Sequence, residues 1–302
     1  MLSTRHFHFR ARWAVAGLTG AVLFVAAACG GQSGTAASAA PATPSMATPG
    51  QSTSGMSFGM HDMFSGDGLA AEASGLRLTP AGSSLPANQA SVFRFQIRGT
   101  DGIPVTSFQP DQTKLMHLYL IRSDLTGFQH VHPTVASDGT WTANLTATPA
   151  GSYRAYASFI ARVSGRDVPL VLSQPVTVPG MTATVPLPAP STSTTTDGYT
   201  LTVSGATPMA GMTHMLMVAV TKGGNPVNDL QPYLDTYAHL TAFHAGDLAF
   251  THLHPQGTVD GDHGGPTLSF DAALPEAGNW RLFLQFETAG TLHTAELTLV
   301  VG

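Results

Sequence analysis

From about residue 69 to the end, the chain alternates short apolar runs with polar breaks. The runs are rich in Val, Thr, Phe, Tyr and Leu, and Gly, Pro, Asn or Asp interrupts them about every 8 to 12 residues. This spacing is typical of strands and turns in a β-sandwich. No segment keeps a helical apolar period beyond about two turns, although residues 230–240 would suit one short helix. The pattern therefore predicts an all-β fold.

Two histidine-containing segments of equal length divide this region into halves. Residues 116–133 read MHLYLIRSDLTGFQHVHP, and residues 238–255 read AHLTAFHAGDLAFTHLHP. The halves align at an offset of 122 residues through these segments and of 127 further on, and a Pro- and Thr-rich stretch separates them. We therefore expect two tandem immunoglobulin-like or cupredoxin-like β-sandwich domains, joined by a linker. The expected bounds are 69–179 for domain 1, 180–197 for the linker and 198–302 for domain 2.

The N-terminal segment has the pattern of an export signal. Three arginines precede an apolar run that ends in small residues directly before Cys29. We expect residues 1–28 to be a lipoprotein signal peptide and Cys29 to carry the lipid, with an ordinary secretory signal as the alternative. Residues 29–68, rich in Gly, Ser, Thr, Ala and Pro, then predict a flexible tether. The expected location is the extracytoplasmic face of the cell membrane, with the membrane itself as a partner.

Composition excludes several classes of function. Cys29 is the only cysteine, so once it is lipidated no thiol remains for a disulfide or for a blue-copper centre. Charged residues make up 10% of the chain and the formal net charge is −5, so no basic stripe indicates a nucleic-acid partner. We find no serine nucleophile motif, HExxH helix or phosphate-binding glycine loop, and we expect no enzymatic activity.

The repeated histidines are the strongest indication of chemistry. In an antiparallel hairpin, opposed residues have a constant sum of residue numbers and lie on the same face. In domain 1, a sum of 249 places His117 opposite His132, whereas a sum of 247 places His117 opposite His130. In domain 2, a sum of 493 places His239 opposite His254. Three imidazoles then converge in each domain, within reach of one metal ion. The six candidate ligands are His117, His130, His132, His239, His252 and His254.

Histidines on strands also serve purely structural roles, so a second interpretation stays open. In it, each H-x-H pair hydrogen-bonds to loop carbonyls and is repeated because the domain is duplicated. The agreement between the copies does not decide between the two.

Methionines suggest a softer site. Met212 and His214 precede or begin a strand of domain 2 and would suit Cu(I), while Met215 and Met217 are expected to fill the core. In the tether, the sequence GMHDM offers further soft donors, with incidental methionines as the alternative. These additional candidates are Met60, His61 and Met63.

The "HL…HxHP" segments, together with the signal sequence, resemble a type of bacterial lipoprotein and secreted protein. These proteins, mostly actinobacterial, carry the segment in duplicated β-sandwich domains and are often associated with heavy-metal or copper handling. The resemblance covers about residues 85–302. It implies copper as the metal, although the ligand motif of periplasmic copper chaperones is not matched residue by residue.

We therefore expect a membrane-tethered, extracytoplasmic metal-binding protein that captures, buffers or hands off copper, with zinc as the second choice. Neutral imidazoles suit Cu(II) or Zn(II), and a metal-donor or metal-acceptor protein would be its partner. The main alternative is a non-catalytic adhesion or scaffolding lipoprotein with structural histidines. A metal-dependent hydrolase that uses His252, His254 and either Asp260 or Asp262 is a weaker one.

Overall fold

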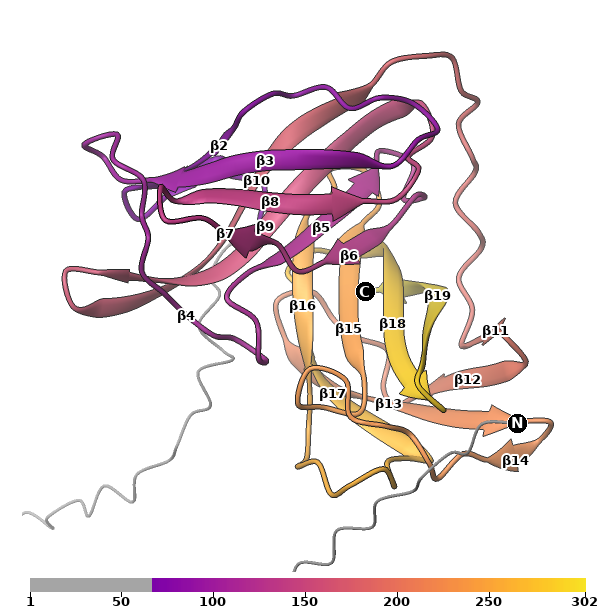
Figure 1. The fold of residues 1–302 in the computed structure, drawn as a ribbon. Helices are drawn as coiled ribbons and strands as arrows, with labels where there is room; N and C mark the ends of the chain where they lie inside the picture. Colours follow the sequence, from indigo (N-terminus) through magenta and orange to yellow (C-terminus); the bar gives the residue numbers. More distant parts are fainter. Residues whose placement is uncertain (1–66) are drawn as a thin grey trace, which may run out of the picture. The chain divides into compact units, whose positions relative to one another are not determined.

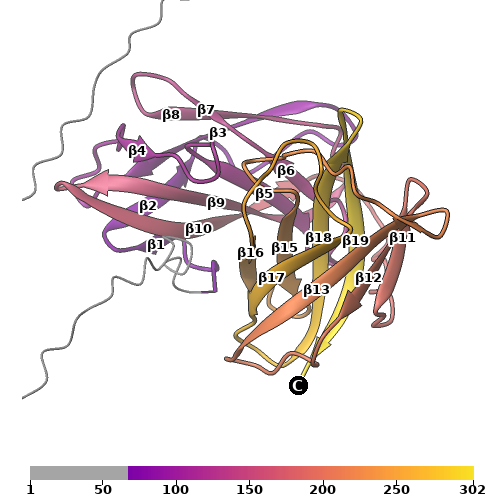
Figure 2. The same ribbon diagram turned by 90° about the horizontal axis from the view of Figure 1, so that it is seen from below.

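The structure, a computed structural model, describes residues 67–302, which belong to one compact unit beginning at residue 56. Every regular element in this range is a β-strand (Figures 1 and 2). The strands form two lobes, β1–β10 in lobe 1 and β11–β19 in lobe 2. Within each lobe, every pair of neighbouring strands is antiparallel. The all-β prediction and the tandem sandwich are therefore confirmed. The expected signal peptide and tether, residues 1–66, lie outside the described residues.

Lobe 1 is a sandwich of two sheets. The first sheet has the order β1-β2-β3-β8-β7; the second has the order β10-β9-β5-β6, with β4 added beside β9. The strands are β1 (Glu72–Ala73), β2 (Leu76–Pro80), β3 (Ser91–Arg98), β4 (Phe108–Gln109), β5 (His117–Arg122), β6 (Gln129–Val131), β7 (Thr134–Val135), β8 (Thr140–Leu145), β9 (Gly151–Val163) and β10 (Arg166–Val178).

Lobe 2 has nine strands, with the continuous β16 in place of β6 and β7, and its two layers are joined. The order is β11-β12-β13-β17-β16-β15-β18-β19, with β14 beside β13. The strands are β11 (Ser193–Thr196), β12 (Tyr199–Ser204), β13 (Thr213–Lys222), β14 (Asn225–Pro226), β15 (His239–His244), β16 (Phe250–Pro255), β17 (Thr267–Ala273), β18 (Gly278–Thr288) and β19 (Thr291–Val301). Strand β16 pairs first with β15 and then with β17, whereas lobe 1 breaks at His132 and Pro133 between β6 and β7.

Two local expectations differ from the structure. Residues 230–240 form isolated bridges and the start of β15, with no helix, because Leu234 and Asp235 adopt positive φ angles of 57° and 59° that end a right-handed turn. Strand β11 begins at Ser193, inside the segment that we expected to be linker. In the described part of the chain, no helix is long and apolar enough to span a membrane.

The lobe 2 hairpin has the register that the sequence predicts, and the lobe 1 hairpin has one of the two that the sequence left open. In lobe 1, Leu118 pairs with Val131 and Tyr119 with His130, which is the sum of 249. In lobe 2, Leu240 pairs with Leu253, which is the sum of 493. The register places His117 and His130 on one face of lobe 1, and His239 and His252 on the equivalent face of lobe 2.

The methionines of β13 contradict the prediction of core packing. Met215 and Met217 are 57% and 38% exposed, while Leu216, between them, is buried. The burial patterns match Phe93 and Phe95 of β3 with Leu216 and Val218, an offset of 123 and not 122. The loop that follows is one residue shorter in lobe 2. Because successive side chains point to opposite faces of a strand, the expectation that Met215 and Met217 fill the core placed the wrong face of β13 inside.

The lobes contact each other through an apolar cluster that we call the interlobe cluster. Strand β5 is buried along its whole length, and β15 in all but its last residue, so both strands are covered on both faces. One face belongs to the core of its own lobe, and the other meets the opposite lobe. The buried members of the interlobe cluster are Tyr119, Ile121, Leu125, Tyr156, Phe243, Phe250 and Phe283.

Equivalent positions meet in this contact. Ile121 corresponds to Phe243, and Tyr156 corresponds to Phe283 at the later offset of 127. The same face of each lobe is therefore used, as in an interface between two copies related by a two-fold axis. A hydrogen bond of 2.5 Å from Tyr156 Oη to the carbonyl of Leu248 ties lobe 1 to the β15–β16 turn of lobe 2.

Candidate functional site

Histidines of both lobes gather at the edge of the interlobe cluster. In lobe 1, the ring of His117 lies 5.3 Å from that of His130 and 5.0 Å from that of His132, between centroids. His239 of lobe 2 lies 4.7 Å from His130, and His252 lies 4.1 Å from His239. We call these five residues the histidine cluster. The expected convergence within lobe 1 is confirmed, but the histidines form one shared cluster where the sequence suggested two separate sites.

Three of these rings are close enough to share one metal ion. One ring nitrogen from each of His117, His130 and His239 lies within 4.8 Å of the others. Two of the donors come from β5 and β6, and the third comes from β15. A metal at this position would therefore bind both lobes at once.

Burial favours the neutral form of the three lobe 1 rings. His117 and His239 are fully buried, and His130 and His132 are partly buried. Burial lowers the pKa of His117. Burial, followed by the neighbouring rings of His117 and His132, lowers the pKa of His130 well below its ordinary value. Burial, followed by His117 and Lys114, lowers the pKa of His132 to about 3. Neutral imidazole is the form that binds metals.

The hydrogen bonds assign a bare nitrogen to two of the rings. His130 Nδ1 lies 2.7 Å from Gln285 Oε1, and the amide nitrogen of Gln285 faces Thr294, so His130 Nδ1 carries the hydrogen and Nε2 does not. His117 Nε2 lies 3.1 Å from the carbonyl oxygen of Asp111, which can only accept. His117 therefore carries its hydrogen on Nε2, and its Nδ1 is bare. Both assignments follow from the hydrogen-bond network.

The two bare nitrogens face each other. His117 Nδ1 and His130 Nε2 are 3.1 Å apart. Two lone pairs repel at this distance unless a cation lies between them, and burial disfavours a proton there. Two nitrogens bound to one metal at about 2.0 to 2.1 Å, with an angle of about 90° to 110°, are about 2.9 to 3.4 Å apart. The observed separation fits a shared metal ion.

Three residues that the sequence did not indicate complete the surroundings. Gln285 and the carbonyl of Asp111 orient the rings of His130 and His117, as outer partners of metal-bound histidines commonly do. Tyr119 stacks on His130 at 4.3 Å, and its hydroxyl lies 2.9 Å from His239 Nε2. Burial raises the pKa of Tyr119 well above 10, so the hydroxyl stays protonated.

The structure describes the remaining candidates only in part. His254 is the residue of β16 that pairs with Asp271 of β17. Met212 precedes β13 and is 55% exposed, and His214, in β13, has a buried Nε2 without a hydrogen-bond partner in the described residues. Asp260 and Asp262 are exposed and belong to neither metal-compatible group that the described residues form. Cys29, Met60, His61 and Met63 lie outside the described residues.

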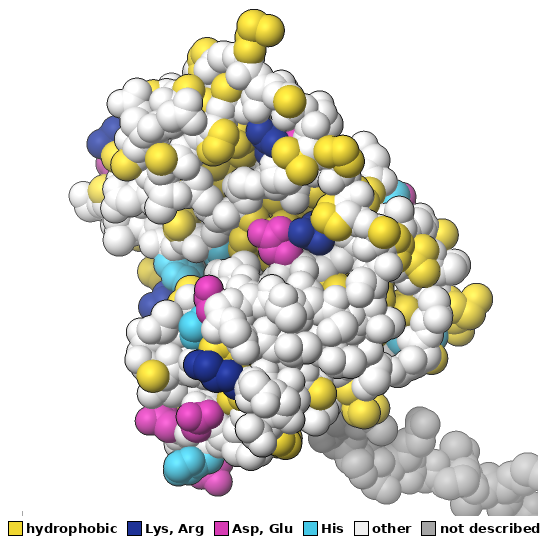
Figure 3. All heavy atoms as spheres, turned by 90° about the vertical axis from the view of Figure 1, so that its right-hand side faces the viewer, with side chains coloured by type: hydrophobic (Ala, Val, Ile, Leu, Met, Phe, Trp, Pro, Cys, Tyr) yellow, Lys and Arg dark blue, Asp and Glu magenta, His cyan; other side chains and the backbone are white. Residues whose placement is uncertain are grey.

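A second group of ligand-type side chains lies at the β15–β16 turn. His244, Asp247 and Glu276 bring one nitrogen and two carboxylate oxygens within 4.8 Å of one another. On the face shown in Figure 3, Lys and Arg side chains stand apart from one another.

These features define a tandem β-sandwich protein with a histidine cluster shared by its lobes. The chain belongs to the DUF8832 family, described as a domain of unknown function, which matches residues 71–174 and 194–302. The family unit thus occurs once in each lobe. No curated protein matches the chain.

Among solved structures, the chain is similar to the Escherichia coli adhesin FdeC, with 17% identity and a TM-score of 0.25, over 77% of this chain and 66% of that one. It is also similar to a Salmonella alpha-2-macroglobulin, with 14% identity and a TM-score of 0.26, over 77% and 15% of the two chains. It is similar as well to the Yersinia pseudotuberculosis adhesin InvE, with 16% identity and a TM-score of 0.21, over 74% of this chain and 58% of that one. The chain spans less than two thirds of each of these structures. No conclusion about its function follows from them.

Proposed function

We propose that this protein binds a transition-metal ion in the histidine cluster and acts in capture, buffering or hand-off of that ion. Cu(II) is the favoured ion and Zn(II) the second choice. Imidazole suits both ions, and nitrogen sites of this kind generally bind Cu(II) more tightly than Zn(II). The observation that carries the proposal is the 3.1 Å separation of two bare nitrogens, His117 Nδ1 and His130 Nε2.

The surroundings support binding without turnover. His117 and His239 are fully buried, whereas His132 and His252 are partly exposed, so an ion would approach from the side of the latter two. The buried Nε2 of His132 has no hydrogen-bond partner in the described residues and supplies a further donor. We assign no catalytic role to the cluster.

The proposal includes the location expected from the sequence. A lipid on Cys29 would tether the protein to the extracytoplasmic face of the membrane, where a metal-donor or metal-acceptor protein would be its partner. Residues 29–68 would give the lobes reach from the membrane. Mass spectrometry of the protein from a native membrane extract tests this part, and an unmodified Cys29 would contradict it.

Titration of the purified full chain with Cu(II), Zn(II) and Cu(I) separately tests the site. We expect His130→Gln and His239→Gln each to remove the same single bound Cu(II), because the two ligands come from different lobes but share one ion. His263→Gln is the matched control, since this histidine is exposed in the loop after β16 and should leave the stoichiometry unchanged.

Two outcomes would contradict the proposal. If the stoichiometry is the same in the His130 and His239 variants as in the unmodified chain, the cluster is not the site. If each variant removes a different ion, so that the double variant loses two, the lobes bind metal independently and the shared centre is wrong.

The second candidate is a non-catalytic adhesion or scaffolding protein with structural histidines. The observation that favours it is that the cluster's contacts also link the lobes: His130 bonds to Gln285, and Tyr119 to His239. In this role the histidines would fix two sandwiches for the display of their loops. It predicts no tight metal uptake and a thermal midpoint that does not change with a chelator, whereas a bound metal would raise the midpoint.

A further inference from the structure

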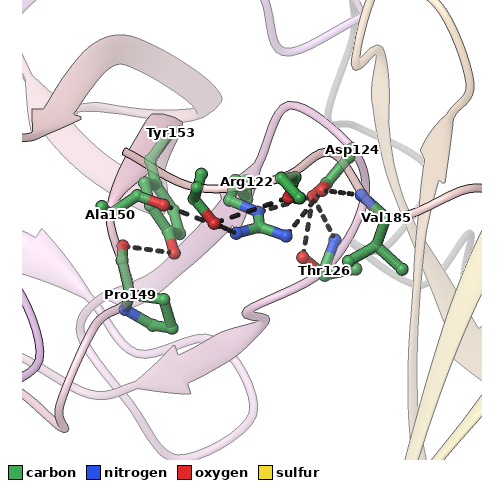
Figure 4. Close-up of polar contacts among 9 residues, drawn as sticks. Arg122, Asp124, Thr126, Pro149, Ala150, Tyr153 and Val185 are labelled. Atoms are coloured by element: carbon green, nitrogen blue, oxygen red, sulfur yellow. Dashed lines mark hydrogen bonds and ion pairs between the residues drawn. The ribbon is translucent and has the colours of Figure 1, made fainter. Parts of the chain in front are cut away.

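Equivalent hairpins of the two lobes, β5–β6 and β15–β16, carry different charged side chains. In lobe 1, Arg122 donates to both carboxylate oxygens of Asp124, at 2.8 and 2.6 Å, and to the carbonyl of Ala150 at 3.4 Å (Figure 4). Both side chains of the pair are less than 10% exposed. A Cβ on Gly151 would lie 2.7 Å from Arg122 Cδ, so glycine makes room for this side chain. A permanent cation therefore occupies this position in lobe 1.

Lobe 2 repeats this arrangement with a histidine. His244 corresponds to Arg122, and Ala277 and Gly278 correspond to Ala150 and Gly151. His244 Nε2 lies 3.2 Å from the carbonyl oxygen of Ala277, and a Cβ on Gly278 would lie 2.9 Å from the same nitrogen. The ring of Trp280 also contacts the imidazole, with 5.1 Å between the ring centroids. The imidazole is thus fixed in one orientation.

This orientation points the second nitrogen of His244 at two carboxylates. The carbonyl of Ala277 can only accept, so Nε2 carries the hydrogen. Nδ1 lies 2.8 Å from Asp247 Oδ1 and 3.7 Å from Glu276 Oε2. The lobe 1 residues at the positions of Asp247 and Glu276 are Leu125 and Pro149. Gly246 stands at the position of Asp124, so lobe 2 replaces one carboxylate by two. Lobe 2 has therefore lost the permanent cation and gained one negative group, a balance that favours a further cation here.

We propose that a divalent metal ion, with Zn(II) as the best match, binds between His244 Nδ1, Asp247 and Glu276. One imidazole and two carboxylates suit Zn(II), and donors bound to it lie about 3 to 3.5 Å apart, between the two observed separations. The side chains of Asp247 and Glu276 are 39% and 48% exposed, so they can adjust and leave an open coordination position for water. Mg²⁺ and Ca²⁺ prefer oxygen ligands alone and should not compete.

The ion would stabilise the β15–β16 turn, which is hydrogen-bonded to lobe 1. Asp247 lies in the β15–β16 turn and also accepts a hydrogen bond from the amide of Ala249. The neighbouring carbonyl of Leu248 accepts the hydrogen bond from Tyr156 of lobe 1. The second site therefore supports the interlobe contact from the lobe 2 side. It does not depend on the histidine cluster.

Zn(II) competition titration of the full chain against a chromophoric chelator tests this site, in a His130→Gln/His239→Gln background that removes the histidine cluster. We expect one Zn(II) to remain. His244→Gln should abolish its binding, and Glu276→Gln should weaken it at least tenfold. Asp229→Asn, an exposed carboxylate outside both groups, is the control and should change nothing.

Two further measurements separate a metal ion from a proton. His244→Arg places at this position the same side chain as Arg122 of lobe 1, so it should abolish Zn(II) binding. The thermal midpoint of this variant, measured in the presence of a chelator, should be unchanged or raised. The ring signals of His244 in an NMR spectrum near pH 7.5 should shift on addition of Zn(II). If no Zn(II) binds in the cluster-free background, or if those signals do not respond, a protonated His244 alone satisfies the carboxylates and the inference is wrong. Loss of the cluster site alone would leave this result unchanged.

Discussion

The comparison of the two lobes shows which parts of a duplicated fold are interchangeable. The acceptor carbonyl and the glycine of the hairpin site are the same in both, at Ala150 and Gly151 and at Ala277 and Gly278. The donor side chain is not the same: lobe 1 uses a buried Arg122–Asp124 pair, and lobe 2 uses His244 with two exposed carboxylates. The backbone thus offers an acceptor carbonyl at this place in both lobes, but the side chain that donates to it is free to change.

The corner beside β9 and β18 teaches the same lesson. Tyr153 Oη donates to the carbonyl of Pro149, and Trp280 Nε1 donates to the carbonyl of Glu276, four residues back in each case. A tyrosine at this corner is typical of immunoglobulin-like sandwiches. Lobe 2 meets the same requirement with an indole, so the donor matters more than the ring that carries it.

The largest difference between the lobes should appear when each hairpin loses its basic side chain. Arg122→Gln should cost about 3 to 5 kcal/mol of unfolding free energy, because it leaves Asp124 buried without its cation. When a chelator removes the metal, His244→Gln should lower the free energy of unfolding by about 0 to 1 kcal/mol, because the carboxylates beside His244 are well exposed. Urea unfolding followed by the fluorescence of Trp141 and Trp280, one buried in each lobe, measures both. Equal losses would remove the distinction between the hairpins.

Acid should affect the lobes unequally. Burial alone would raise the pKa of Asp124, but hydrogen bonds from Arg122, Val185 and Thr126, and the charge of Arg122, lower it to about 2. A lowered carboxyl pKa stabilises the folded state above the unfolded pKa of about 4, and this stabilisation, about 2 kcal/mol, is lost as the pH falls toward 2. Urea unfolding between pH 5 and 2 should show this loss in lobe 1 and not in Arg122→Gln. A variant with the same slope would contradict the assignment.

Much of the fold could be predicted from local patterns. The turn spacing predicted the sandwiches, and the index sums predicted the register of the lobe 2 hairpin and limited that of lobe 1 to two, of which the structure has the sum of 249. The orientation of β13 could not be predicted from the constant offset, since a one-residue deletion in the following loop is invisible until the burial of Leu216 is known. Periodicity is reliable only within one uninterrupted strand.

The shared site was harder to predict, although one signal was present. The run HLYLI has no polar side chain on either face apart from the histidine and the tyrosine hydroxyl, and such strands are covered on both sides. That pattern in both copies indicates that the equivalent faces cover each other. The contribution of Gln285 carries no such signal, because it depends on how lobe 2 is placed against His130.

A smaller effect is expected from the hydrogen bond that crosses between the lobes. Tyr156→Phe keeps the ring in the interlobe cluster but removes its bond to Leu248, and should cost about 1 kcal/mol. Tyr153→Phe is the matched control, since its bond to Pro149 stays within lobe 1. Hydrogen exchange at the β15–β16 turn should increase in the first variant alone. An increase in both would mean that the turn responds to the stability of lobe 1 and not to the contact.

The smallest effect should come from the exposed methionines that distinguish β13 from β3. Met215→Thr and Met217→Thr should each change the unfolding free energy by no more than about 0.5 kcal/mol, because these side chains are on the solvent face and threonine suits a strand. Leu216→Thr, one residue away but buried, should cost more than about 2 kcal/mol, since it removes core packing and buries a hydroxyl. Urea unfolding of the three variants compares the faces directly. A loss in the Met215 or Met217 variant as large as that for Leu216 would show that the outer face of β13 is covered in solution, which would make it a contact surface that its counterpart in lobe 1 lacks.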